Sequence, residues 1–103
     1  MKYCKVEQLE NKNQFIIKAE KHIYFQSYDS LIAVYDREKS VLILGRDWNY
    51  SKTTMKHLYI FIDCYCNTRI LNNLRYAKNK KEYLNYCIKC KDIKDVKYNK
   101  NMF

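Results

Sequence analysis

The chain has 103 residues, of which 48% are hydrophobic, and a formal net charge of +9. This is the length of one domain with a modest core, and the hydrophobic content excludes a disordered chain. No apolar run approaches the roughly 20 residues that span a bilayer, and no apolar stretch follows the basic N-terminus as in a secretory signal. We therefore expect a cytoplasmic protein that does not contact a membrane.

The first half of the chain, residues 1–46, is predicted to form strands. The run 41–44 is apolar at every position, which is typical of a strand covered on both faces. The polar segment 36–39 before it has the length of a hairpin turn, and the only glycine, Gly45, follows it. These features predict a small antiparallel meander of three to five strands. The short apolar, β-branched runs that would form its strands are 14–18, 22–26, 31–35 and 41–44.

The second half, residues 51–90, is predicted to form helices. Ser51 is a favoured N-cap residue, and 67–68 break or cap the helix that follows it. Two further helical pieces are expected around 70–77 and 83–88. The apolar positions that define one face of the first helix are Met55, Leu58, Tyr59, Ile62 and Cys66.

The predicted elements combine into an α+β fold. Two or three helices would pack on one face of the meander, within a single domain that spans 1–103. Residues 91–103 alternate Lys with apolar residues, so we expect either a basic tail or a short strand there.

The net charge is unevenly distributed. Residues 1–65 carry ten basic and eight acidic side chains, a net of +2, whereas 66–103 carry ten basic and three acidic, a net of +7. Asn, Tyr and Ile are also abundant, so part of the Lys excess reflects A/T-rich codons. Codon usage does not explain why the excess charge lies in the second half. A basic half favours contact with polyanions, and a solvated Lys-rich face is the alternative. The candidate cations are Arg69, Arg75, Lys78, Lys80, Lys81 and Lys89, and the candidate stacking rings are Tyr50, Tyr76, Tyr83 and Tyr86.

Residues 48–57 concentrate hydroxyl, cationic and aromatic side chains at the predicted helix start. A helix N-terminus offers free N–H groups to a phosphate, and aromatic rings offer stacking faces to bases. The structural alternative is that Ser51 caps the helix, Trp48 fills the core, and Thr53 or Thr54 bonds His57. The candidate contact residues are Tyr50, Ser51, Lys52, Thr53, Lys56 and His57.

The five cysteines predict neither a disulfide framework nor a metal site. The pairs 64/66 and 87/90 resemble two halves of a four-thiolate zinc site. However, the first pair has one residue between its cysteines where zinc sites have two to four, and on a helix such residues point about 200° apart. We expect buried cysteines that act as small hydrophobes, and no metal or cofactor.

No catalytic motif is present. A nucleophile requires Cys or Ser beside a His that a carboxylate orients. His57 lies near Ser51, Cys64 and two aspartates in sequence, but the spacing matches no known motif, and there is no Gly-rich phosphate loop. We expect a non-enzyme, with a hydrolase or nuclease centred on His57 as the minor alternative.

Two stretches carry a family resemblance. Ser-Tyr-Asp-Ser-Leu-Ile-Ala at 27–33 precedes the 48–57 segment and then Phe61. This resembles short uncharacterised proteins of phages and mobile elements in low-GC bacteria, in which a Ser-Tyr-x-Thr-x-Ile-Ala strand precedes a Tyr-Ser-x-Thr-Thr-x-Lys/Arg-His segment. Residues 27–61 are covered, and Ser30 stands where the pattern has Thr. No catalytic residue carries over, because the family has no assigned chemistry.

The resemblance implies a phage origin, and small phage proteins often bind and block host machinery. We therefore expect a non-enzymatic phage accessory protein that binds and inhibits a host nucleoprotein defence complex, of the anti-CRISPR type. The expected partner is a host protein or ribonucleoprotein, such as a CRISPR effector. The alternative is a small basic nucleic-acid-binding module with a regulatory role.

Overall fold

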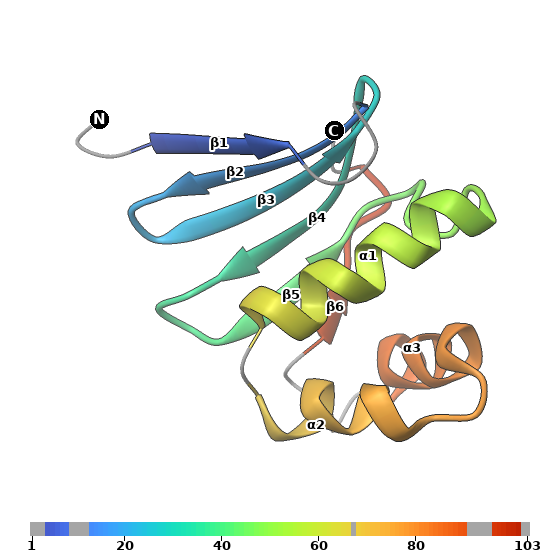
Figure 1. The fold of residues 1–103 in the computed structure, drawn as a ribbon. Coiled ribbons are helices and arrows are strands. Elements are labelled where there is room, and N and C mark those ends of the chain that lie inside the picture. The colour runs from blue at the N-terminus through green and yellow to red at the C-terminus, as the bar shows by residue number, and fades with distance from the viewer. Residues whose placement is uncertain (1–3, 9–12, 67, 91–95, 102–103) are drawn as a thin grey trace.

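A six-stranded sheet with helices on one face forms the α+β fold of the computed structural model, which describes residues 4–8, 13–66, 68–90 and 96–101 (Figure 1). The strands are β1 (Cys4–Gln8), β2 (Gln14–Ala19), β3 (His22–Ser27), β4 (Ser30–Asp36), β5 (Val41–Leu44) and β6 (Val96–Tyr98). The helices are α1 (Lys52–Tyr65), α2 (Arg69–Asn72), the 3-10 turn η1 (Asn73–Tyr76) and α3 (Lys80–Lys89).

Strands β1 to β5 form an antiparallel meander, in which each strand pairs with the next along the chain. This confirms the predicted meander followed by helices. The short strand β6 adds to the edge in parallel with β5. A parallel neighbour needs a long crossover, and the whole helical segment provides it. The other residues of the predicted tail or strand, 91–95 and 102–103, lie outside the described residues.

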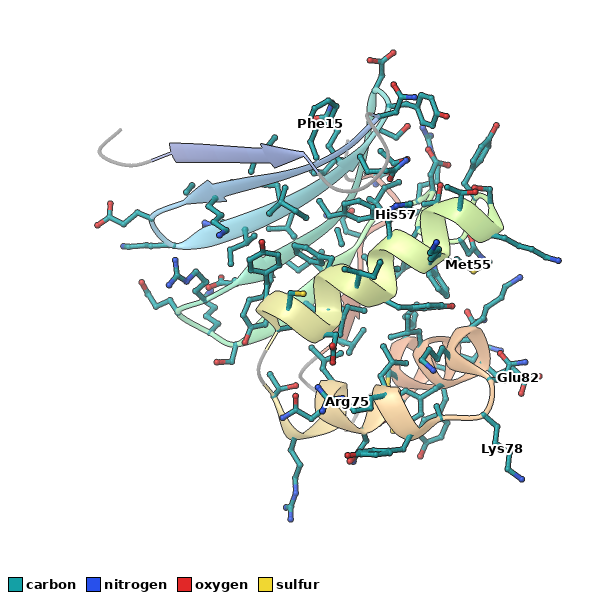
Figure 2. All side chains as sticks on the ribbon, in the orientation of Figure 1. Phe15, Met55, His57, Arg75, Lys78 and Glu82 are labelled. Atoms are coloured by element: carbon teal, nitrogen blue, oxygen red, sulfur yellow. The ribbon has the colours of Figure 1, made fainter. Side chains whose placement is uncertain are left out.

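The core lies between the sheet and α1. Every second residue of β3 is buried on the helix side, with Phe25 fully buried at its centre. Helix α1 packs against β3 and β4, and its fully buried Phe61 stacks on Phe25 with ring centroids 5.8 Å apart. Alternation sends Phe15 to the opposite face, which no described helix covers (Figure 2). The aromatic stack therefore fixes α1 on one side of the sheet.

Helix α1 packs on the sheet and contacts α2 on another side, whereas α3 packs against η1 and β6 (Figure 1). Of the predicted apolar face, Leu58, Ile62 and Cys66 are buried. Tyr59 is half-buried and packs against the core, and Met55 is half-buried. Thr54 and His57 are also buried, although the spacing of apolar residues did not predict this. A helix with contacts on two sides buries a wider arc than one amphipathic stripe, and here that arc includes the polar residues Thr54 and His57.

The prediction that residues 41–44 are covered on both faces was wrong. Leu42 and Leu44 are fully buried, whereas Val41 and Ile43 are half-buried. The helices cover one face of the sheet only, so β5 alternates as a strand with one covered face does.

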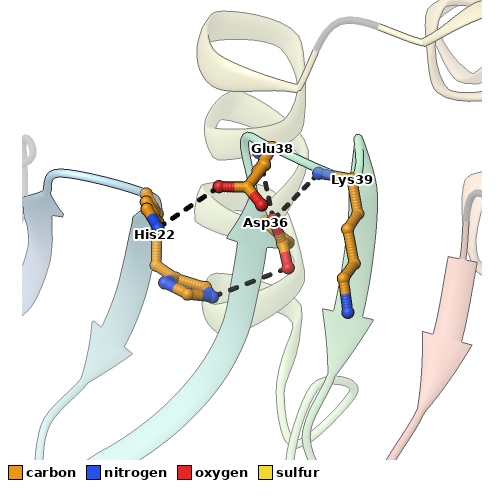
Figure 3. Close-up of polar contacts among 5 residues, drawn as sticks. His22, Asp36, Glu38 and Lys39 are labelled. Carbon is orange, nitrogen blue, oxygen red and sulfur yellow. Dashed lines mark hydrogen bonds and ion pairs between the residues drawn. The ribbon is translucent and has the colours of Figure 1, made fainter.

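The turn between β4 and β5 is organised by Asp36 (Figure 3). Its Oδ1 accepts the backbone N–H groups of Glu38 and Lys39, each at 3.0 Å. Its Oδ2 lies 3.6 Å from His22 Nε2, and Lys21 Nζ lies 3.5 Å from Glu38 Oε2. The N–H bond from Lys39 above all, then those from Glu38 and the charges of His22 and Lys39, hold the pKa of Asp36 below its ordinary 3.8.

Acid titration tests this turn. A carboxyl whose folded pKa is depressed contributes stability that is present above the unfolded value, 3.8, and is lost as the pH falls through the folded pKa. The free energy of unfolding of wild type should exceed that of Asp36→Asn between about pH 5 and 6, and the difference should shrink below about pH 4. Urea titrations at several pH values measure it, with Glu20→Gln as the charge-matched control. A pH-independent difference would contradict the prediction.

The aromatic stack predicts a large effect of truncation. Phe61→Ala should lower the free energy of unfolding by about 3–5 kcal/mol, because it removes a fully buried ring between sheet and helix. Cys64→Ala, on the exposed side of the same helix, should change it by less than about 0.5 kcal/mol. Urea denaturation of both variants gives the comparison, and equal effects would contradict the packing described.

Candidate functional site

The two stretches that carry the family resemblance meet at one cleft of about 620 Å³, between the β3–β4 turn and the start of α1. We call it the hairpin–helix cleft. Of the predicted contact residues in 48–57, the cleft includes Tyr50, Ser51 and Thr53 but not Lys52, Lys56 or His57. Its lining residues are Ser27, Tyr28, Asp29, Ser30, Ile32, Asp47, Tyr50, Ser51, Thr53 and Thr54.

The hairpin side of the cleft is built on Tyr28. This residue has φ 54°, a left-handed backbone that is rare for a bulky side chain. Its N–H donates to the Asn13 carbonyl and its carbonyl accepts from Gln26 Nε2, both at 2.7 Å. The ring remains 60% exposed. Hydrogen bonds on both sides therefore hold the turn in a conformation that presents Tyr28 and Asp29 to the cleft.

A β-bulge forms the floor of the cleft. The register between β3 and β4 shifts after Phe25, which leaves Ile32 as the extra residue of β4. The backbone carbonyl of Ile32 accepts a hydrogen bond from the N–H of Gly45 at 2.8 Å. The chain that leaves β5 is thereby held beside the bulge, and Asp47 and Tyr50 lie at the cleft.

The helix side of the cleft confirms the predicted N-cap. Ser51 has extended backbone angles, and its Oγ accepts the Thr54 N–H at 3.1 Å. The same hydroxyl lies 3.1 Å from Thr54 Oγ1 and donates to it. Trp48 is buried in the core, as the structural alternative predicted, whereas Tyr50 is 79% exposed. Tyr50 is therefore the ring of this segment that a ligand can reach.

His57 belongs to the helix–sheet interface. It is buried, and its Nδ1 lies 2.9 Å from the backbone carbonyl of Thr53, so Nδ1 carries the proton and donates it. The expected bond one turn back is confirmed, although to the backbone of Thr53 rather than a hydroxyl. Among the described residues its Nε2 has no hydrogen-bond partner. In this structure the His57 ring is inaccessible to a ligand, and no Ser, Thr or Cys side chain of the described residues hydrogen-bonds to it.

The charge of the cleft is opposite to that expected. Asp29 and Asp47 line it, and none of the lining side chains is Lys, Arg or His. Asp47 Oδ1 lies 3.9 Å from Nε of the exposed Arg46. Two carboxylates outweigh the roughly half charge of a helix N-terminus. The phosphate contact expected at this helix start stays a prediction: the cleft offers it no cationic side chain, while Lys52 and Lys56 are exposed outside the cleft.

The second surface is the segment α2–η1–α3, which we call the basic helical layer. Residues 66–90 hold six basic side chains and one acidic one, Glu82. Figure 2 shows Lys78 extending outward from the connection before α3. All six predicted cations lie in this layer: Arg69, Arg75, Lys78, Lys81 and Lys89 are exposed, and Lys80 is half-buried.

One of the six cations has a local partner. Arg75 Nε donates to Asp63 Oδ1 at 3.2 Å, and a second guanidinium nitrogen contacts the same oxygen, which ties η1 to α1. This hydrogen bond to Asp63 raises the pKa of Arg75 above its ordinary value. No ion pair is formed by the other five within the part of the chain that the structure describes. The free charge therefore resides in the lysines and Arg69.

The basic helical layer also carries exposed rings. Of the four candidate stacking rings, Tyr76 and Tyr86 lie in this layer and are open to solvent, with exposed fractions of 78% and 61%. Tyr83 is half-buried, and burial raises its pKa. Asn79 caps α3, because its Oδ1 accepts the Glu82 N–H at 3.1 Å. This bond fixes the start of α3, whose N-cap directly follows Lys78.

Four of the five cysteines have described side chains, and these four form no thiolate cluster. Cys64 is exposed, Cys66 and Cys87 are buried, and Cys90 is half-buried. Burial raises the pKa of Cys66 far above its ordinary value, which opposes the thiolate that a metal needs. The described residues contain no group of three or more His, Cys, Asp or Glu that could hold a metal ion. Cys66 and Cys87 pack as small hydrophobes, as predicted.

The fold and its two surfaces define a small α+β protein with an acidic, hydroxyl-rich cleft and a basic helical layer. Residues 4–83 match a family of unknown function (DUF8033), and the chain belongs to that family. The matched residues include the whole cleft and the first part of α3. Searches of curated proteins and of solved structures found no match. None of the described helices is long and apolar enough to cross a membrane.

Removal of the N-cap should weaken the helix side of the cleft. Ser51→Ala should lower the free energy of unfolding by about 1 kcal/mol, because the Thr54 N–H loses its acceptor. Ser51→Asp keeps an acceptor and should retain most of the stability. Thr53→Ala, exposed in the same turn, is the control and should change it by less than about 0.5 kcal/mol. Chemical denaturation that ranks the two alanine variants equally would contradict the role of Ser51.

Proposed function

We propose that the protein is a non-enzymatic phage accessory protein that binds and inhibits a host nucleoprotein defence complex of the CRISPR type. The observation that carries the proposal is the basic helical layer, in which five cations lack an ion pair with any described residue. The phage origin and the inhibitory role rest on the sequence resemblance of residues 27–61. The layer supplies the kind of surface that such a role needs.

The chemistry of the basic helical layer suits a nucleoprotein. Lysines and arginines gain affinity for phosphate backbones through the release of condensed counterions. Exposed tyrosine rings stack on unpaired bases without sequence preference. Tyr76 and Tyr86 lie in the same layer as the free cations. A complex that holds a guide strand or a displaced single strand presents both phosphates and unpaired bases.

The polar groups near α1 support binding rather than catalysis. The Ser51 hydroxyl is engaged with Thr54, and the His57 imidazole with the Thr53 carbonyl. A nucleophile and its base must lie within hydrogen-bond reach of each other. The described residues around His57 provide no such pair. The hydrolase alternative would need a rearrangement of this helix start.

A regulatory nucleic-acid-binding module is the second candidate function, and the same layer favours it. The two candidates differ in what is bound. A direct binder recognises bare DNA or RNA, with an affinity that falls steeply as salt increases. An inhibitor binds the assembled complex more tightly than the nucleic acid alone.

The experiment that tests the proposal is capture from host lysate by the tagged protein, with mass spectrometry and nucleic-acid detection. The wild type should retain a nucleoprotein complex through nuclease treatment. The triple variant Lys78→Glu/Lys81→Glu/Lys89→Glu should retain at least roughly tenfold less, because it turns attraction into repulsion. The matched control is Lys21→Glu/Arg37→Glu/Lys39→Glu, with three exposed cations at the hairpin turns, and it should bind as wild type does.

Two outcomes would overturn the proposal. Equal capture by the layer variant and wild type would remove the basic helical layer from the interface. Tight, salt-sensitive binding of a labelled oligonucleotide, with no complex captured, would favour the regulatory module instead.

A further inference from the structure

The hairpin–helix cleft is acidic in a chain whose formal net charge is +9. Two of its lining side chains, Asp29 and Asp47, are carboxylates, and none is cationic. Apart from Ile32, all the others bear a hydroxyl: Ser27, Tyr28, Ser30, Tyr50, Ser51, Thr53 and Thr54. A cavity of about 620 Å³ is within the size range of ligand sites. The cleft therefore favours a cationic ligand, whereas the basic helical layer favours an anionic one.

We propose that the hairpin–helix cleft binds an arginine side chain of a partner protein. A guanidinium group presents five N–H donors in one plane and has no acceptor. It matches carboxylates, with which it forms charge-assisted hydrogen bonds, and hydroxyl oxygens can accept its remaining N–H groups. The carboxylates of Asp29 and Asp47 hold the charge, while Ser30 and Thr53 offer further acceptors at the same cleft.

Two tyrosine rings favour guanidinium over a simple ammonium ion. Tyr28 is 60% and Tyr50 79% exposed, one from the hairpin and one from the segment before α1. Guanidinium groups stack on aromatic faces, and the aliphatic part of an arginine side chain packs on such rings while its head reaches the carboxylates. The hydrogen bonds to the Tyr28 backbone hold the turn, so the backbone of this side of the cleft is ordered before a ligand binds.

The competing local charges are weak. The N-terminus of α1 contributes roughly half a positive charge, and the Ser51 hydroxyl already occupies one of its N–H groups. Arg46 lies 3.9 Å from Asp47, but its side chain is 73% exposed, and exposed pairs contribute little. An entering guanidinium can therefore replace Arg46 at Asp47. A phosphate would meet two carboxylates, and a neutral sugar would leave their charge uncompensated.

The size of the cleft favours arginine within a polypeptide over a free cation. A volume of about 620 Å³ holds the whole side chain together with neighbouring backbone. The inference does not rest on the proposed function, since the cleft and the basic helical layer share no lining residue. If the partner is a nucleoprotein, the cleft binds its protein component and the layer its nucleic acid.

The test uses the full chain and a fluorescein-labelled pentapeptide, Gly-Ser-Arg-Ser-Gly, with anisotropy at low salt. The same peptide with citrulline is the control, because citrulline keeps the shape and loses the charge. The arginine peptide should bind roughly tenfold more tightly than the citrulline peptide. Asp29→Asn/Asp47→Asn should lose that difference, and Tyr50→Ala should weaken binding severalfold.

Two variants separate the cleft from general electrostatics. Glu20→Gln/Glu38→Gln removes the same charge from exposed positions outside the cleft and should bind as wild type does. The layer variant Lys78→Glu/Lys81→Glu/Lys89→Glu should also keep arginine binding, so failure of the proposed function leaves this result intact. Thermal melts confirm that each variant is folded.

Several outcomes would overturn the inference. Equal binding of the arginine and citrulline peptides would show that charge is not recognised. Undiminished binding by Asp29→Asn/Asp47→Asn would place the contact elsewhere. Tighter binding of spermidine than of the arginine peptide would assign the cleft to polyamines. Binding of maltotriose in place of the peptide would assign it to sugars.

Discussion

The structure depends on the packing of α1 onto β3 and β4, centred on the stack of Phe61 on Phe25. Both rings are fully buried, so the helix cannot slide or tilt without opening the core. This contact places the first turn of α1 beside the β3–β4 hairpin and creates the cleft there. The other side of the same helix supports α2 and η1, through Ile62, Leu71 and Leu74 among others. One helix therefore positions both candidate binding surfaces.

The two surfaces differ in charge because they are built from different parts of the chain. The cleft combines a hairpin turn with a helix start, where Ser, Thr and Asp satisfy backbone N–H groups and turns. The basic helical layer consists of short helices whose exposed positions include Lys and Arg. It contains few carboxylates that could form ion pairs with them. The Asp63–Arg75 pair ties this layer to α1. The proposed nucleoprotein partner would have basic protein segments for the cleft and a phosphate backbone for the basic helical layer.

Much of the fold could be predicted from local pattern. Alternating and β-branched runs identified four of the meander strands, and Ser51 and Asn79 mark the starts of α1 and α3. The buried face of α1 was predicted only in part, because Thr54 and His57 are polar residues and an apolar pattern does not include them. The burial of β5 was overestimated, since an apolar sequence does not reveal which faces the helices cover.

The cleft could be predicted only as two separate motifs. Its lining joins residues 27–32 with 47–54, and a β-bulge at Ile32 brings them together. The sequence contains no glycine in the hairpin turn, so the left-handed conformation of Tyr28 has no compositional signal. The phosphate hypothesis grouped the cations of 48–57 with the hydroxyl residues, but Lys52, Lys56 and His57 are not among the residues that line the cleft. By contrast, the charge of 66–90 predicted the basic layer directly, because exposed cations need no tertiary contact to be recognised.

The central claim is that the basic helical layer is the surface that contacts the nucleoprotein. Hydrogen–deuterium exchange of the protein, alone and bound to the captured host complex, measures this directly. The account predicts slower exchange in α2, η1 and α3 on binding, with the open face of β1 and β2 unchanged. Protection confined to that open face, with exchange in the layer unaltered, would contradict it.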